Sequence, residues 1–238
     1  MKAIIIDDER LARKELTSLL EKHKEIEIVA EAANADEAFD LINQHQPDLL
    51  FLDIQMPGKT GFELLEMLDS VPKVIFTTAY DEYALKAFEV NALDYLQKPI
   101  EAERLEESIG KAKANQITKD QDRVSKKLGL TDQVFVKDGD KCWFVSLSEI
   151  RYFESDGNYI KVFFDKNRPM IHKSLNALDE KLDERSFFRA SRKHIINLSW
   201  LESIEPWFNG GLMVKLRGGD KVEVSRRQSS KFKEMMSL

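Results

Sequence analysis

The chain has 238 residues, 42% of them hydrophobic and 33% charged, and a formal net charge of −6. This composition is typical of a soluble globular protein with room for two domains. No apolar run approaches the roughly 20 residues of a membrane-spanning helix, and the first residues lead into a predicted strand, not a signal peptide. The single cysteine, Cys142, excludes an internal disulfide and a cysteine zinc cluster. A cytoplasmic protein is the simplest interpretation.

The charge is divided unequally along the chain. Residues 1–120 carry 14 Lys and Arg against 25 Asp and Glu, a net charge of −11, whereas residues 121–238 carry 22 against 17, a net charge of +5. An acidic half joined to a basic half suggests two functions, and a basic half is suited to a polyanion such as nucleic acid. An excess of this size is equally compatible with a solvated surface.

Apolar runs and helical patterns alternate through the first half. The apolar runs predict strands at residues 2–6, 26–30, 49–53, 74–78 and 94–96. Helical spacing and two capping pairs, Asn34 with Glu37 and Thr60 with Glu63, predict the intervening helices. These helices are expected at residues 12–23, from 34, from 60 to about 68, at 81–89 and from 101. The pattern predicts a doubly wound α/β domain with a five-stranded parallel sheet.

Polar side chains follow these strands. Asp7 and Asp8 follow the first strand, Asp53 ends the third, Thr78 ends the fourth and Lys98 follows the fifth. Ligands of open parallel sheets bind at the carboxyl ends of the strands, so we expect these five residues to converge.

Such a cluster predicts phosphoryl chemistry. Crowded carboxylates repel one another unless a cation joins them, and oxygen ligands without His or Cys suit Mg²⁺. A lysine and a hydroxyl can bind the oxygens of a phosphoryl group, and an aspartate can accept that group. Asp53 is the predicted acceptor.

The first 120 residues resemble the receiver domain of bacterial response regulators. The matching positions are Asp7-Asp8, Asp53, Met56-Pro57-Gly58, Gly61, Thr78-Ala79, Tyr95 and Lys98-Pro99. The resemblance implies that Asp53 is the phosphoacceptor and that Asp8, Asp53 and the backbone carbonyl of Gln55 bind Mg²⁺, with Asp7 beside them.

The same resemblance assigns the remaining receiver positions. Thr78 and Lys98 are expected to contact the phosphoryl oxygens, and Tyr95 is expected to be the aromatic switch residue. The Lys98–Pro99 bond is expected to be cis, since X–Pro bonds adopt that form at low cost. The implied phosphoryl donor is a sensor histidine kinase.

Other α/β proteins fit less well. A dinucleotide-binding domain needs G-x-G-x-x-G after its first strand, where this chain has Asp7-Asp8-Glu9, which would repel a pyrophosphate; a flavin mononucleotide would be repelled in the same way. Hydrolases with an aspartate nucleophile place a second Asp two residues later, where this chain has Gln55. We therefore predict an acceptor and not an enzyme.

The second half reads as a different domain. Residues 121–131 are predicted to be a linker between a receiver at 1–120 and a second domain at 132–238. In that domain, alternating strands flank Asp-Gly and Gly-Gly pairs at residues 138–139, 156–157 and 218–219, which are hairpin signals. Helices are expected only at about 174–182 and from about 226. A mostly antiparallel β domain follows from this pattern.

The second domain resembles the LytTR DNA-binding domain of LytR/AlgR response regulators from about residue 133 to 236. The matching motifs are Tyr152-Phe153-Glu154, Asn158-Tyr159, Lys173-Ser174-Leu175, Phe187 to Arg192, Ile195-Ile196-Asn197 and Val224 to Arg227. The resemblance implies DNA contacts from loops. Those contacts are expected at Asn197, Arg227, Arg192, Lys193, Arg226, Tyr159 and Asn158.

Together these features predict a two-component transcription factor. Phosphorylation of Asp53 is expected to pair two receivers, whose second domains bind adjacent, direct-repeat-like half-sites of double-stranded promoter DNA. Two rival hypotheses stay open: an aspartyl-phosphate phosphohydrolase, and a β domain that binds a protein instead of DNA.

Overall fold

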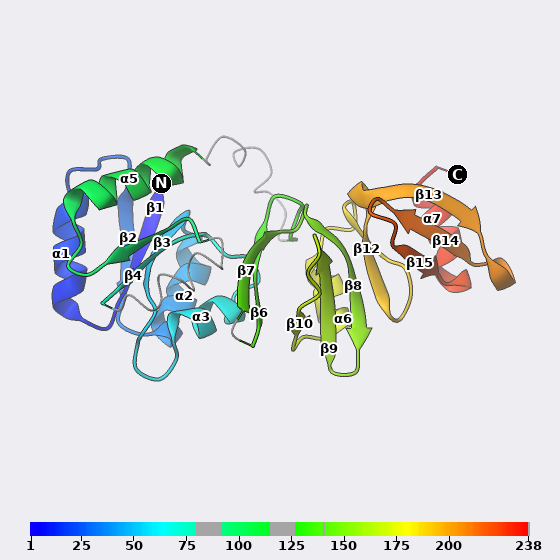
Figure 1. The fold of residues 1–238 in the computed structure, drawn as a ribbon, viewed down its shortest axis with the longest axis horizontal. Coiled ribbons are helices and arrows are strands. Elements are labelled where there is room, and N and C mark those ends of the chain that lie inside the picture. The colour runs from blue at the N-terminus through cyan, green and yellow to red at the C-terminus, as the bar shows by residue number, and fades with distance from the viewer. Residues whose placement is uncertain (80–91, 115–126, 140, 238) are drawn as a thin grey trace. The chain divides into compact units, whose positions relative to one another are not determined.

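The computed structural model describes residues 1–79, 92–114, 127–139 and 141–237 (Figure 1). The chain forms two compact units. Residues 1–121 and 133–144 make up the first, and residues 122–132 and 145–238 the second. No helix in the described part of the chain is long and apolar enough to cross a membrane.

The first unit contains the predicted parallel sheet. Its strands run in the order β2-β1-β3-β4-β5, and each neighbouring pair is parallel. The strands are β1 (Lys2–Ile6), β2 (Glu27–Ala32), β3 (Leu49–Asp53), β4 (Lys73–Thr78) and β5 (Asp94–Gln97). This order reverses direction between β1 and β3, which is where ligands of doubly wound sheets bind.

Helices cover both faces of the sheet. They are α1 (Arg10–Leu20), α2 (Ala35–His45), α3 (Gly61–Met67) and α5 (Ala102–Ala114). Because neighbouring strand residues point to opposite faces, Ile5 packs with Leu16 of α1 and Ile109 of α5, whereas Ile4 packs with Ile42 of α2. The helix predicted at 81–89 lies outside the described residues.

The capping residues chosen from the sequence begin two of these helices. The Asn34 side chain accepts a hydrogen bond from the Glu37 backbone N–H at 2.9 Å, and Thr60 and Glu63 form a reciprocal capping box. The helical pattern at 12–23 extends too far, because α1 ends at Leu20. Local capping thus sets where α2 and α3 start.

A β-hairpin from the middle of the chain completes the core of the first unit. Its strands are β6 (Gln133–Asp138) and β7 (Lys141–Ser146). The Phe135 ring stacks on Phe62 with centroids 6.1 Å apart, and the Phe144 ring lies 6.5 Å from Phe76. The Val71 N–H also donates to the Gln133 carbonyl at 2.8 Å. The sequence predicts this hairpin as part of the second domain; in the structure Gln133–Phe144 groups with the first unit, and the last two residues of β7 group with the second.

The second unit is the predicted antiparallel β domain with two helices. Its five-stranded sheet has the order β10-β9-β8-β12-β11, and a three-stranded sheet has the order β13-β14-β15. The first sheet contains β8 (Ile150–Asp156), β9 (Tyr159–Phe164), β10 (Met170–Ile171), β11 (Phe187–Arg189) and β12 (His194–Asn197). The second contains β13 (Leu201–Pro206), β14 (Leu212–Leu216) and β15 (Lys221–Val224), and the helices are α6 (Leu175–Lys181) and α7 (Arg226–Met235).

Aromatic side chains join the two sheets of this unit to α7. Phe188 of β11 packs on Phe232 of α7 with ring centroids 4.9 Å apart. Both residues belong to a buried cluster that also contains Val214 of β14 and Val222 of β15. The two sheets and α7 therefore share one hydrophobic core.

Candidate functional site

The predicted acidic residues converge at the carboxyl edge of the parallel sheet. Ile6 of β1 is in register with Leu52 of β3, so Asp7 and Asp8 leave β1 beside the end of β3. Asp7, Asp8 and Asp53 each offer a carboxylate oxygen, and these oxygens lie within 4.8 Å of one another. Asp7 and Asp53 are 3% and 5% exposed, whereas Asp8 is open to solvent.

Lys98 reaches this cluster from the end of β5. Its ammonium lies 2.7 Å from Asp53 Oδ2 and 2.7 Å from Asp7 Oδ2. Its backbone N–H donates to the Thr78 carbonyl at 2.8 Å, and the Lys98–Pro99 bond is cis, as predicted. One cation thus bridges two of the three carboxylates, which leaves the cluster with an excess of negative charge.

The pKa values of this pair reflect burial opposed by mutual attraction. Burial raises the pKa of Asp53, and Asp7 adds to the rise, although the hydrogen bond from Lys98 acts in the other direction. For Lys98, burial alone would lower the pKa, but the hydrogen bonds to Asp53 and Asp7 outweigh it and raise the pKa. A divalent cation would relieve the remaining repulsion, and an oxygen-only donor set fits Mg²⁺.

The loop after Asp53 approaches the acceptor closely. The Gln55 N–H donates to Asp53 Oδ1 at 3.1 Å, so the Gln55 backbone lies beside the carboxylate. The Gly61 N–H donates to the Ile54 carbonyl, and a Cβ placed on Gly61 would lie 2.4 Å from the Asp53 carbonyl oxygen. Any residue larger than glycine at position 61 would therefore clash with the backbone of the acceptor.

Thr78 and Tyr95 occupy neighbouring strands on the other side of Asp53. Asp53 is in register with Thr77, and the adjacent Thr78 is buried at the end of β4. Tyr95 pairs with Phe76 across β4 and β5, and its half-buried side chain packs against the core that contains Phe76 and Phe144. Thr78 therefore lies at the carboxyl edge of the sheet with Asp53, and Tyr95 lies on the next strand; residues 80–91 lie outside the described part.

The predicted DNA contacts of the second unit are exposed, with one exception. The exposed residues are Asn158, Tyr159, Arg192, Lys193, Arg226 and Arg227. The first four lie in the β8–β9 turn, at the start of β9 and in the loop between β11 and β12, and the last two begin α7. The fold leaves these side chains accessible to a large ligand.

Asn197 is the exception, and its prediction as a DNA contact is wrong. Its side chain is 0% exposed. Its amide nitrogen donates to the carbonyls of Leu147 and Ile150 at 3.1 and 2.8 Å, and its oxygen accepts from the Ser199 N–H and hydroxyl at 3.0 and 2.7 Å. Four hydrogen bonds use the full capacity of an asparagine amide. Asn197 therefore stabilises the loop connections and cannot reach DNA.

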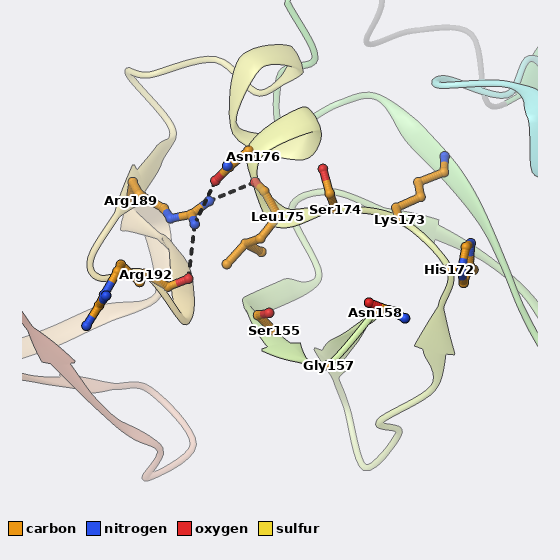
Figure 2. A pocket seen from close by; sticks show the side chains of 10 residues that line it. All are labelled: Ser155, Gly157, Asn158, His172, Lys173, Ser174, Leu175, Asn176, Arg189 and Arg192. Carbon is orange, nitrogen blue, oxygen red and sulfur yellow. Dashed lines mark hydrogen bonds between the residues drawn. The ribbon is translucent and has the colours of Figure 1, made fainter.

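A polar cavity beside the candidate DNA contacts involves residues that the sequence did not single out for binding (Figure 2). Asn158 and Arg192 line it together with His172 and Lys173, from the segment between β10 and α6. Lys173 belongs to a motif that supported only the family resemblance. Its place beside Asn158 depends on how the loops fold, which no sequence periodicity reports.

Arg189 holds two walls of this cavity together. Its guanidinium donates to the Leu175 carbonyl at 2.8 Å and to Asn176 Oδ1 at 3.1 Å, at the start of α6. It also donates to the carbonyls of Ser191 and Arg192 at 2.7 and 3.1 Å. Figure 2 shows Arg189 between α6 and the loop that carries Arg192. Arg189 is thus a positioning residue for Arg192.

Two known domain families match the chain. The response regulator receiver domain matches residues 3–110, and the LytTr DNA-binding domain matches residues 140–237, from one residue before β7. The sensory transduction protein LytT of Enterococcus faecalis is 36% identical over 241 residues, which is 100% of both chains. The chain belongs to the LytTR family of response regulators.

Other full-length relatives agree with this assignment. LytT of Bacillus subtilis is 32% identical and the transcriptional regulatory protein BtsR of Salmonella typhi is 34% identical, each over 100% of both chains. A receiver domain followed by a LytTR domain is the architecture of a DNA-binding response regulator in a two-component system. The receiver match lies within the first unit, whereas the DNA-binding match begins in the first unit at residue 140 and covers the second unit from Val145 to residue 237.

Proposed function

We propose that Asp53 accepts a phosphoryl group from a sensor histidine kinase and that the modified receiver controls DNA binding by the second unit. The observation that carries the proposal is the convergence of Asp7, Asp8, Asp53 and Lys98 at the strand ends. Asp53 and Asp7 are both nearly buried and both contact Lys98, but Asp53 ends the central strand β3 and is the one that accepts a hydrogen bond from the Gln55 N–H. This arrangement presents one carboxylate to an incoming phosphorus atom.

The residues around Asp53 would bind the transferred group. When bound, Mg²⁺ held by Asp8, Asp53 and the Gln55 carbonyl, with Asp7 beside it, would offset the negative charge of the phosphoryl oxygens. An Asp53 oxygen forms the new bond to phosphorus as the donor's bond to phosphorus breaks and the leaving imidazole takes up a proton. Lys98 then moves from the carboxylate to a phosphoryl oxygen, where the Thr78 hydroxyl also donates.

The proposed signal leaves the site through Thr78 and Tyr95. The Thr78 hydroxyl moves toward the new phosphoryl group, and the Tyr95 ring turns further into the core against which it already packs. Two receivers then pair, and the paired DNA-binding units occupy adjacent half-sites in the bacterial cytoplasm. Pairing raises affinity through effective concentration and needs no new contact to the bases.

Arg192, Lys193, Arg226 and Arg227 are proposed to hold the DNA, with Asn158 and Tyr159 at the same surface. The four cations are exposed and lie in a loop and at a helix start. Guanidinium groups in such positions can reach phosphates and base edges. Asn197 is left out of this set because it is buried.

Labelling with radioactive acetyl phosphate tests the acceptor. Wild-type protein is expected to take up label in the presence of Mg²⁺, and Asp53→Ala is expected to take up none. Asp40→Ala, which removes an exposed carboxylate of α2, is the matched control and should label normally. Label on Asp53→Ala would refute the assignment.

Two measurements separate this proposal from its rivals. A phosphohydrolase would release many equivalents of phosphate from small phosphate esters, whereas an acceptor takes up at most one equivalent per chain. Selection of bound sequences from random duplexes should enrich a repeated half-site. If the pool shows no enrichment, the second unit binds something other than specific DNA.

A further inference from the structure

The cavity beside Asn158 and Arg192 has the chemistry of an anion site. It measures about 680 Å³ and lies between the β8–β9 turn, the segment from β10 to α6, and the loop from β11 to β12. None of the described residues that line it is acidic, and Leu175 is its one aliphatic side chain. Asn158, His172, Lys173 and Arg192 are among the polar and cationic side chains that line it.

The two cations at the rim of the cavity, Lys173 and Arg192, lie where an extended anion could contact both. Figure 2 shows Arg192 and Lys173 on opposite sides of the cavity, with Asn158 between them and with their charged ends directed away from its centre. All three residues are exposed. Arg189 also lines the cavity, but its donors are bonded to backbone carbonyls and Asn176. A small enclosed anion would meet neither rim cation, whereas a polymer that crosses the cavity would meet both.

We propose that this cavity seats the sugar–phosphate backbone of one DNA strand, with Lys173 and Arg192 each binding a phosphate and Asn158 donating to the backbone between them. The inference rests on the proposed DNA binding of the second unit. It adds Lys173 and the 172–174 segment to the interface and assigns them a role that carries no sequence preference, because phosphate contacts position a protein on DNA without reading bases.

The neighbouring aromatic contact supports a continuous surface. His172 lines the cavity, and its ring packs edge-on against Tyr159 with centroids 5.3 Å apart. Tyr159 is 45% exposed, although large aromatic side chains are usually buried. The 172–174 segment thus joins the predicted contact Tyr159 to the cavity rim.

The salt dependence of DNA binding by the full-length chain tests the proposal. Each lost phosphate contact makes the negative slope of log K (the association constant) against log salt shallower by about 0.9. It also reduces the affinity at 0.1 M salt about five- to tenfold. Lys173→Gln should show both effects, to the same extent on the selected duplex and on a random duplex. Lys166→Gln, at an exposed lysine that does not line the cavity, is the matched control and should bind as the wild type does.

The outcomes separate this inference from the proposed function. If wild-type protein binds no duplex, the proposed function fails. If it binds and Lys173→Gln keeps its affinity and slope, the backbone site is wrong and the proposed function stands. A loss confined to the selected duplex would show that Lys173 reads bases, which also overturns the backbone role.

Titration with pyrophosphate distinguishes a polymer from a small phosphate compound. A DNA-backbone site should bind pyrophosphate at most weakly, since the two cations flank the cavity. Tight pyrophosphate binding that disappears in Lys173→Gln, with DNA binding unchanged, would assign the cavity to a small phosphate ligand and overturn the proposal.

Discussion

The receiver carries its functional side chains at the ends of buried strands, whereas the DNA-binding unit carries them in turns and at the start of a helix. Asp7, Asp53 and Thr78 are between 1% and 5% exposed, while Arg192 and Arg227 are exposed. In the receiver, strand order alone brings distant residues together. In the second unit, loops must be held by polar groups that bind no ligand themselves, such as Arg189 and Asn197.

The largest expected effect comes from the hairpin of β6 and β7, and it tests whether this hairpin is part of the receiver core. Phe135 is 7% exposed and stacks on Phe62, so Phe135→Ala should destabilise the receiver by about 3–5 kcal/mol through lost burial and a cavity. Hydrogen exchange of peptides from β3 and β4 would report this loss. Phe208→Ala, at a residue 74% exposed, is the control and should change stability little. Unchanged protection of β3 and β4 in Phe135→Ala would place the hairpin outside the receiver.

Two asparagines of the second unit differ in their expected roles: Asn197 stabilises the fold, and Asn158 contacts DNA. Asn197→Ala removes the donor partner of the Leu147 and Ile150 carbonyls, two residues that are themselves 0% exposed, and should cost about 2–4 kcal/mol. Asn158→Ala, at an exposed turn residue, should leave urea unfolding unchanged and weaken DNA binding. If Asn197→Ala unfolds like the wild type but loses DNA affinity, Asn197 is a contact after all.

Two glycines of the receiver differ in how tightly their surroundings are packed. Gly61→Ala places a Cβ against the Asp53 carbonyl oxygen, at 2.4 Å before any shift, and should cost about 1–3 kcal/mol and slow labelling of Asp53. Gly110 lies in α5 with nothing within 4 Å of its potential Cβ, so Gly110→Ala should stabilise the protein by about 0.5–1 kcal/mol. Equal behaviour of the two variants in urea unfolding would mean that the loop after Asp53 is not tightly packed.

Sequence reasoning predicted that Asp7, Asp8, Asp53 and Lys98 converge, because the determinants of that placement are periodic and local. Alternation of strands and helices defined the parallel sheet, and the residue after each strand then had to lie at one edge, as Asp7, Asp53 and Lys98 do. The caps at Asn34 and Thr60 were also predictable, because each joins two residues that are three positions apart in the chain.

The same reasoning failed where burial depends on tertiary packing. Asn197 ends a four-residue strand, and nothing in its neighbours shows that its amide turns inward to bind Leu147 and Ile150. The hairpin signal around Gly139 predicted β6 and β7 correctly, but alternating apolar residues do not show that Phe135 and Phe144 pack with Phe76 in one core. Lys173 was missed as a site residue because its partners across the cavity come from loops distant in the chain.

The smallest expected effect is a pH dependence of the stability of the second unit, caused by the titration of His194. Burial lowers the pKa of His194 below its usual 6.5, although Glu154, with Oε1 at 3.6 Å, opposes the shift. The unfolded chain then binds a proton that the folded chain does not. Stability is therefore full above pH 6.5 and falls as the pH drops from there toward the lower folded value. His194→Gln should reduce the difference between urea midpoints at pH 7.5 and 5.5. An unaltered difference would show that the loop between β11 and β12 admits the charged ring, so that this part of the DNA-binding unit is less tightly held than the receiver edge.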